Sequence, residues 1–206
     1  MKELGVENNI INELHWRDFY VNITHYFPKV LQHPQGNNSF QQKFDQVEWK
    51  YNSKHLEAWK KGETGFPIVD AAMRELNTTG YMHNRCRMIV ASFLAKDLFL
   101  DWHEGEKYFA SKLVDYSPMQ NSGGWQWTVG NGTDAQPYFR IFNPWSQQVN
   151  YDPECVYIKR WVPELRHVPN EDIHKWNTTC NLYIKKGVNY PSPMIDHSEA
   201  RNETLA

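Results

Sequence analysis

Apolar residues recur along this chain with the spacing of amphipathic α-helices, and no sustained stretch alternates with the period of two that is typical of β-strands. The clearest helical patterns cover residues 8–27, a segment that begins at Pro67, residues 83–100 and residues 104–116. The third of these is the most apolar, and we expect it to lie near the centre of the fold. The pattern therefore predicts an all-α protein.

Proline and glycine residues predict where several helices begin and end. Pro67 suits the first position of a helix, where its missing N–H is not needed, and Gly80 follows the end of the same helix. Asp152 followed by Pro153 predicts the start of another helix, over residues 155–161. Residues 121–132, in contrast, contain so many glycines that they predict an ordered loop.

Length and composition favour one soluble, intracellular domain over residues 1–206. The chain can bury a sizeable core, and from about residue 187 it becomes a polar, proline-containing tail. No stretch reaches the length of a membrane span, and the first residues lack a signal-peptide pattern. Three irregularly spaced cysteines match neither a metal motif nor a disulfide set, so we expect a reducing compartment and no metal site. The formal charge of −2 argues against non-specific coating of nucleic acid, but it leaves room for a local basic face.

The segment Gly123-Gly124-Trp125-Gln126-Trp127 places two indoles after paired glycines. One interpretation is structural, a loop pinned to the core by its aromatic side chains. The other is functional, because glycines allow a planar cofactor to approach the backbone closely. Asp115 lies shortly before Asn121, and Arg87 on the preceding predicted helix is placed to pair with Asp115.

Four residues of the first predicted helix share one face, because they follow each other at intervals of three and four: Glu13, Trp16, Arg17 and Tyr20. The structural interpretation is an amphipathic face with an ion pair between Glu13 and Arg17, which contributes roughly 0.2–0.5 kcal/mol. The functional interpretation is the wall of a pocket, since a large indole lies beside both charges.

Two adjoining segments mix apolar residues at helical spacing with charges that a plain core helix does not need: Thr64-Gly-Phe-Pro-Ile-Val-Asp-Ala-Ala-Met-Arg-Glu-Leu76 and Asn84-Arg-Cys-Arg-Met-Ile-Val-Ala-Ser-Phe-Leu-Ala-Lys-Asp-Leu98. Both closely resemble the flavin-binding helical domain of DNA photolyases and cryptochromes. The resemblance extends from about Ile11 to Leu205. It implies a helical domain that binds reduced FAD and acts on damaged DNA.

By this resemblance, Arg87 and Asp115 flank the flavin ring, and the amide of Asn121 lies beside its reactive N5 edge, where it counts as a catalytic residue. Tyr116 and Ser117 belong to the same cofactor-binding segment, in which the family's Asp-Gly-Asp is replaced by Asp115-Tyr116-Ser117. The role of the protein at such a site is to orient the flavin and tune its electronic properties, while the cofactor carries the chemistry.

The resemblance also implies a DNA-binding face, since photolyases are a known example of enzymes that flip their target out of the duplex. Glu13 is expected to bond a thymine edge as a catalytic residue, and Trp16 is expected to stack on the lesion. The other positions that match substrate or DNA contacts are Arg17, Tyr20, Asn84, Arg85, Met88, Trp127 and Gln147.

Three further tryptophans, Trp49, Trp102 and Trp125, match the positions that carry electrons from the surface to a photoexcited flavin in this family. Without the resemblance, packing in the core is the natural interpretation of all three, and their spacing in the sequence does not show that they approach one another.

Within the family, the chain is most similar to class I photolyases of cyclobutane pyrimidine dimers. Asn84 and Met88 match their pattern, whereas His83 alone does not make the catalytic histidine pair of the 6-4 type. Asn121 also matches photolyases better than plant or animal cryptochromes, which usually have Asp or Cys at that position.

Two parts of the family's full chain have no counterpart in this sequence: the α/β domain that holds an antenna chromophore, and a Thr-Ser-x-Leu-Ser segment that cradles the flavin phosphates. We therefore expect the catalytic part of a split or truncated photolyase, which works with a separate N-terminal chain and binds FAD weakly by itself. A cryptochrome-type photosensor and an inactive fragment are the alternatives.

Overall fold

The computed structural model describes residues 9–31, 39–133 and 140–205, and in these ranges it confirms an all-α fold. The extended pairing that it contains there is one isolated bridge between Lys50 and Leu100. The α-helices are α1 (Asn9–Tyr26), α2 (Ser53–Lys61), α3 (Pro67–Thr79), α4 (Asn84–Ser92), α5 (Trp102–Lys112), α6 (Pro118–Val129), α7 (Pro144–Tyr151), α8 (Val156–Trp161), α9 (Asn170–His174), α10 (Trp176–Lys185) and α11 (His197–Leu205). Short 3₁₀ turns cover η2 (Pro28–Leu31), η3 (Gln42–Phe44) and η5 (Pro163–Leu165), and a π-helix, η4 (Phe93–Asp97), continues α4.

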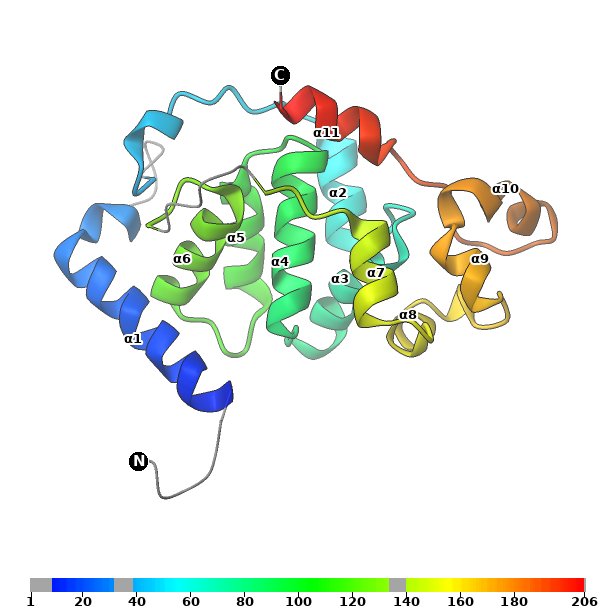
Figure 1. The fold of residues 1–206 in the computed structure, drawn as a ribbon, viewed down its shortest axis with the longest axis horizontal. Helices are drawn as coiled ribbons and strands as arrows, with labels where there is room; N and C mark the ends of the chain where they lie inside the picture. The colour runs from blue at the N-terminus through cyan, green and yellow to red at the C-terminus, as the bar shows by residue number, and fades with distance from the viewer. Residues whose placement is uncertain (1–8, 32–38, 134–139, 206) are drawn as a thin grey trace.

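Helix α4 lies in the middle of the molecule, as its apolar sequence predicts, and packs against α3 and α6 (Figure 1). Helix α6 in turn packs against α5 and α1, while α8 covers α3. Figure 1 shows α1 and α10 at opposite ends of the molecule. The middle of the bundle is therefore covered on several sides, whereas α1 is attached mainly through α6 and η2.

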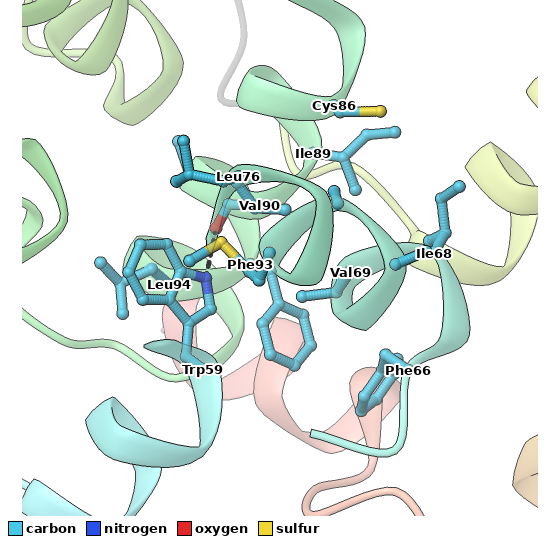
Figure 2. Close-up of a cluster of buried hydrophobic side chains, with 14 of the residues drawn as sticks. Trp59, Phe66, Ile68, Val69, Leu76, Cys86, Ile89, Val90, Phe93 and Leu94 are labelled. Carbon is cyan, nitrogen blue, oxygen red and sulfur yellow. Dashed lines mark hydrogen bonds between the residues drawn. The ribbon is translucent and has the colours of Figure 1, made fainter. Parts of the chain in front are cut away.

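The core is built around α3 and α4 from large apolar side chains (Figure 2). Trp59, Phe66, Leu76 and Phe93 have no exposed surface. The indole of Trp59 donates a hydrogen bond of 3.0 Å to the carbonyl of Val90. A buried indole needs a partner for its N–H, so this bond lets α2 bury its largest side chain against α4.

The start of α3 is organised by the carboxylate of Asp70, which is completely buried. It accepts hydrogen bonds from the backbone N–H of Thr64 (2.8 Å) and of Gly65 (2.9 Å), and from the hydroxyl groups of Thr64 and Tyr190. Burial raises the pKa of Asp70, and these hydrogen bonds act in the opposite direction. Pro67 occupies the first turn and Gly80 ends α3 with φ +71°, as the sequence predicts.

The prediction of a loop over residues 121–132 is wrong, because α6 runs through most of this segment. Pro118 stands in the first turn, and Gly130 ends the helix with φ +96°. The paired glycines are tolerated inside α6 because tertiary packing outweighs their low helix propensity. In particular, the ring of Tyr20 occupies the space where a side chain of residue 123 would stand.

The helix predicted over residues 155–161 is present, and α8 begins one residue later, at Val156, so that Pro153 lies outside it. Cys155 precedes it in the left-handed conformation, with φ +51°. The carboxylate of Asp152, three residues before the N-cap position, still caps the helix. It accepts hydrogen bonds from the backbone N–H groups of Tyr157 (3.1 Å) and Ile158 (2.9 Å).

Two other helix boundaries differ from the pattern in the sequence. The helix predicted over residues 83–100 becomes the π-helix η4 after Ser92, and Phe99 then turns the chain with φ +52°. Helix α5 begins at Trp102, not at residue 104, because the Asp101 side chain accepts the N–H of His103 at 3.0 Å.

The segment after residue 187 is more than a polar tail. Tyr190 is buried, and the backbone N–H of Met194 donates to the carbonyl of Thr64 at 3.0 Å. The chain continues into α11, in which Thr204 donates its hydroxyl to the Lys96 carbonyl at 2.6 Å. Within the part of the chain that the structure describes, no helix is long and apolar enough to cross a bilayer.

We predict that Tyr190→Phe destabilises the fold by about 1–3 kcal/mol, because the buried Asp70 carboxylate loses a hydrogen-bond donor that water cannot replace. Urea-induced unfolding followed by circular dichroism measures this change. Tyr183→Phe is the matched control, because Tyr183 also donates to a carboxylate, that of Asp172, but at the surface. Equal stability of wild type and Tyr190→Phe would contradict the role given to Asp70.

Candidate functional site

Arg87 and Asp115 form the ion pair that the sequence suggested. The Nη2 atom of Arg87 donates to both carboxylate oxygens of Asp115, at 3.0 and 2.8 Å. Its Nε donates to the carbonyl of Met82 at 2.7 Å. The guanidinium group is thus held at two places, so it fixes the loop before α6 against the first turns of α4.

Asn121 is oriented by Glu106, a residue that sequence reasoning missed. The amide Nδ2 of Asn121 donates to the Glu106 side chain at 2.8 Å and to its backbone carbonyl at 3.0 Å. Glu106 is buried, with 5% of its surface exposed. The spacing between α5 and α6 does not encode this contact, because it forms only when the two helices pack together. As a result, the carbonyl oxygen of Asn121 is the part of its side chain left to meet a ligand.

The segment before α6 carries the two residues that depart from the family's Asp-Gly-Asp. Tyr116 is exposed, and its pKa is raised by partial burial and by the nearby charge of Glu106. Ser117 precedes α6, and its hydroxyl contacts the side-chain oxygen of Gln120. The amide of Gln120 donates to the carbonyl of Arg17 at 2.9 Å. Ser117 therefore takes part in the contact that joins α6 to α1.

Helix α1 presents an aromatic face beside α6. The ring of Tyr20 lies over Gly123, and it stacks on Trp16 with a centroid distance of 6.1 Å and an interplanar angle of 30°. Trp16 also makes an edge contact with Phe19 at 5.6 Å. About half of the Trp16 surface, 49%, is exposed. This exposed indole is available to stack on another flat ring.

The ion pair considered between Glu13 and Arg17 is not what the structure contains. Both side chains are exposed, and Arg17 pairs with its neighbour Asp18, with contacts of 3.2 and 3.1 Å. The structural explanation for this face, an internal ion pair, is therefore wrong.

A second polar region lies where α4 begins, next to α7. Asn84 is exposed, and the guanidinium group of Arg85 lies 4.6 Å above the ring of Tyr151. Met88 follows one turn later and is half-buried. On α7, the side-chain oxygen of Gln147 is buried without a hydrogen-bond partner among the described residues. The structure thus brings Arg85, at the start of α4, close to Tyr151 on α7, so that the two helices share one polar surface.

The three tryptophans matched to electron transfer differ in burial. Trp125 and Trp102 are each 2% exposed, whereas Trp49 is half-buried. The indole of Trp125 packs directly against Gly105, which lies one turn after Trp102 on α5. Trp49 contacts Phe99, with ring centroids 5.3 Å apart. Trp125 and Trp102 are therefore equally buried, and Trp49 is the more exposed of the three.

The remaining aromatic residues around Trp125 show why packing alone is a reasonable explanation for burial. Trp59 and Phe109 lie 6.2 and 5.1 Å from Trp125. Trp127, two residues further along α6, is half-buried.

The cavity between α1 and α6, lined in part by Tyr20 and Gly123, measures only about 10 Å³. It has room for about one water molecule, so a large cofactor does not fit between these two helices.

Comparisons with known proteins agree with this arrangement. Residues 10–206 match the model of a family described as the FAD binding domain of DNA photolyase. The chain belongs to this family. It is 50% identical over 199 residues to the deoxyribodipyrimidine photo-lyase of Escherichia coli, and 45% identical over 197 residues to that of Halobacterium salinarum. In both cases the match covers 95% of this chain and 40% of the relative, so the chain spans less than half the length of these relatives.

Solved structures give the same result. An archaeal photolyase from Sulfolobus tokodaii, described with two FAD molecules, has a TM-score of 0.86 and 44% identity, over 99% of this chain and 45% of its own. A class III photolyase from Agrobacterium tumefaciens has a TM-score of 0.87 and 42% identity, over 96% and 41%. A cryptochrome from Synechocystis has a TM-score of 0.85 and 37% identity, over 95% and 40%. The helical fold is thus shared by both branches of the family.

We predict that Gly123→Ala destabilises the protein by about 1–3 kcal/mol, because the new Cβ would lie 2.2 Å from a ring carbon of Tyr20 and force α1 away from α6. Thermal unfolding measures the loss. Gly124→Ala is the matched control, since a Cβ there meets nothing within 4 Å. We expect this variant to gain up to about 1 kcal/mol from helix propensity. The same change in both variants would mean that α1 does not pack on Gly123.

Proposed function

We propose that this chain forms the FAD-binding, catalytic part of a DNA photolyase that repairs cyclobutane pyrimidine dimers. The observation that carries the proposal is the pair of buried or bidentate contacts that fix Asn121 to Glu106 and Arg87 to Asp115. Both contacts hold polar groups in place next to the aromatic face of α1 and the polar start of α4. Such fixed polar groups are what an enzyme needs to orient a cofactor.

The residues present fit the ring system of a flavin. A flavin offers both hydrogen-bond donors and acceptors along its edge, and here the carbonyl oxygen of Asn121 and the Arg87–Asp115 pair provide complementary groups. Bound reduced FAD would supply an electron to the dimer on absorbing light and take it back once the ring has split. The role of Asn121 is then to hold a proton-bearing edge of the ring through a side chain that Glu106 keeps from rotating.

The phosphates of FAD need donors as well, usually backbone N–H groups at the start of a helix. The ring-side groups named above come from α4, α5 and α6, and the segment Asp115-Tyr116-Ser117 carries one carboxylate where the family's pattern has two. We therefore propose that the phosphates are held by a segment of the photolyase that lies N-terminal to α1. In this proposal a separate N-terminal chain completes the cofactor site.

The substrate face is assigned to α1 and to the start of α4. Trp16 supplies an exposed indole for stacking on a flipped dimer, and Glu13 supplies a carboxylate on the same face for a thymine edge. Arg85 is held near the surface by Tyr151, where it can neutralise a DNA phosphate. A dimer costs less to flip than a normal base pair, because the lesion already weakens pairing and stacking.

His83 supports a cyclobutane dimer as the substrate over a 6-4 lesion. Its Nδ1 accepts the backbone N–H of Arg85 at 3.1 Å, so the imidazole serves as the N-cap of α4. A histidine used as a cap is not free to exchange protons with a lesion through that nitrogen. With His83 in this structural role, the segment does not provide the pair of catalytic histidines that 6-4 photolyases use.

The three tryptophans are assigned to electron transfer because two of them are buried in the core and the third, Trp49, is partly exposed. Trp125 and Trp102 are protected from water, and Trp49 reaches the surface. A route of this kind allows an oxidised flavin to be reduced from outside. Packing explains the burial of each tryptophan individually, but it does not require that the outermost one be exposed.

The central prediction is that the chain binds FAD weakly alone and tightly once the N-terminal part of a photolyase is added. With FAD reduced, the completed assembly should repair thymine dimers under near-UV or blue light. Titration followed by flavin absorbance measures binding, and loss of dimers from an irradiated oligonucleotide measures repair. Stoichiometric FAD on the chain alone would contradict the shared phosphate site. Retained dimers in a flavin-loaded, reduced assembly would contradict the enzyme assignment and favour a photosensor.

A second prediction separates stacking from phosphate contacts. Trp16→Ala should weaken binding to dimer-containing DNA by about 1–3 kcal/mol, as for one lost base stack, and leave undamaged DNA unchanged. Arg85→Ala should weaken both DNAs and reduce the salt dependence of binding, because one phosphate contact is lost. Fluorescence anisotropy at several salt concentrations measures both effects. Equal losses on both DNAs for Trp16→Ala would show that the indole is only structural.

A further inference from the structure

The imidazole of His103 stacks on the indole of Trp102, with ring centroids 3.8 Å apart and an interplanar angle of 28°. Both residues are buried, with 6% of His103 and 2% of Trp102 exposed. Adjacent residues of a helix normally point in different directions, so this contact at the start of α5 needs a further hold on the imidazole. The side chain of His103 has no part in the roles assigned above.

Asp101 supplies this hold. Its Oδ1 lies 2.6 Å from Nδ1 of His103 and also accepts the backbone N–H of the same residue at 3.0 Å. Burial acts to raise the pKa of Asp101, but the hydrogen bonds from His103 outweigh it and lower that pKa. Asp101 is therefore ionised at neutral pH, and because an ionised carboxylate only accepts hydrogen bonds, Nδ1 of His103 carries a proton. The protonation of the other nitrogen, Nε2, then decides whether the ring is charged.

The elements that pack most closely against α5 bring few other charges to this stack. They are α6, which has no titratable side chain, and η4. The charged side chains of η4 and of the first turns of α5 are engaged with other partners: Lys96, Asp97, Glu104, Glu106 and Lys107. The charge that changes against the face of Trp102 is therefore that of His103.

We propose that His103 controls the flow of electrons through Trp102, an inference that rests on the role of the tryptophans in the proposed function. On that route, Trp125 gives one electron to the photoexcited, oxidised flavin, Trp102 gives one to Trp125, and Trp49 gives one to Trp102. A thiol in solution then restores Trp49. Between the second and third steps, Trp102 carries a positive charge.

The protonation of His103 decides how easily Trp102 takes up that charge. An imidazolium ring 3.8 Å away opposes it, because two stacked and buried rings leave no water between them to screen the repulsion. A neutral imidazole does not oppose it. Electron flow from the surface to the flavin is therefore slow at low pH, where the ring is charged, and faster at higher pH. His103 acts on Trp102 and touches neither flavin nor DNA, so it is a positioning residue.

The first test needs no cofactor and measures the tryptophan fluorescence of the 206-residue chain from about pH 5 to about pH 8. An imidazolium accepts an electron from an excited indole more readily than a neutral imidazole, so it quenches the ring on which it stacks. We expect the fluorescence to rise with pH, and to rise less in Trp102→Phe and in His103→Gln, whose uncharged amide can still donate to Asp101. Circular dichroism verifies that both variants fold.

His25→Gln is the matched control for this measurement. His25 also contacts an aromatic ring, that of Tyr26, with centroids 5.0 Å apart, but it is exposed on α1 and lies outside the proposed electron route. The rise in fluorescence should therefore be unchanged in this variant. An equal rise in wild type and in His103→Gln would overturn the proposal.

The second test follows flavin absorbance during photoreduction of oxidised FAD by a thiol, in the assembly completed by the N-terminal part of a photolyase. The wild-type rate should increase at least about tenfold over the same pH range, relative to the rate of His103→Gln. Trp102→Phe distinguishes the two possible failures. Photoreduction as fast as in wild type would refute the electron route itself, and the role of His103 with it. Slow photoreduction in Trp102→Phe, combined with one pH profile shared by wild type and His103→Gln, would refute the role of His103 alone.

Discussion

The hydrogen bond from the Trp59 indole to the Val90 carbonyl joins α2 to α4, the helix against which α3 and α6 also pack. With Val90, Phe93 and Leu94 fully buried, α4 has little freedom to rotate or slide. Its first turn emerges from the core and carries Asn84 and Arg85 at the surface. The rigid, buried end of this helix thus fixes the positions of Asn84 and Arg85 at its other end.

The same helix changes its geometry where it leaves the core. At η4 the turn widens to a π-helix, a feature that often accompanies functional sites. The widened turn buries Lys96 and Asp97 beside α11, although charged side chains are seldom fully buried. Burial lowers the pKa of Lys96 to about 8, which reflects how poorly this environment solvates a charge. The polar end of the α4–η4 helix also contacts the C-terminal segment directly, through Asp97 with His197 and the Lys96 carbonyl with Thr204.

The sequence predicted best what is encoded locally. The start of α3 at Pro67 and its end at Gly80 follow from backbone preferences, and α1 differs from its prediction by one residue at each end. Helix α6 was missed because its glycines disfavour a helix, and what outweighs them is the ring of Tyr20, which comes from another helix. Glu106 was missed for the same reason, since its contact with Asn121 exists only after α5 and α6 have packed. The ion pair of Arg87 and Asp115 was suggested by spacing and is present, because a loop that follows a short helix returns close to its neighbour.

Helix α1 shows the limit of using an amphipathic pattern to predict burial. Trp16 and Phe19 occupy positions that pattern analysis assigns to an apolar face, yet they are 49% and 38% exposed. In a purely structural helix, such exposure of large aromatic rings favours association with other surfaces. At a surface that stacks on bases the exposure is necessary, because a buried indole has no free face to offer. The periodicity of the sequence shows that one face of α1 is apolar. Which part of that face stays exposed is seen only in the structure, where α1 packs on α6 through Tyr20 and Gly123.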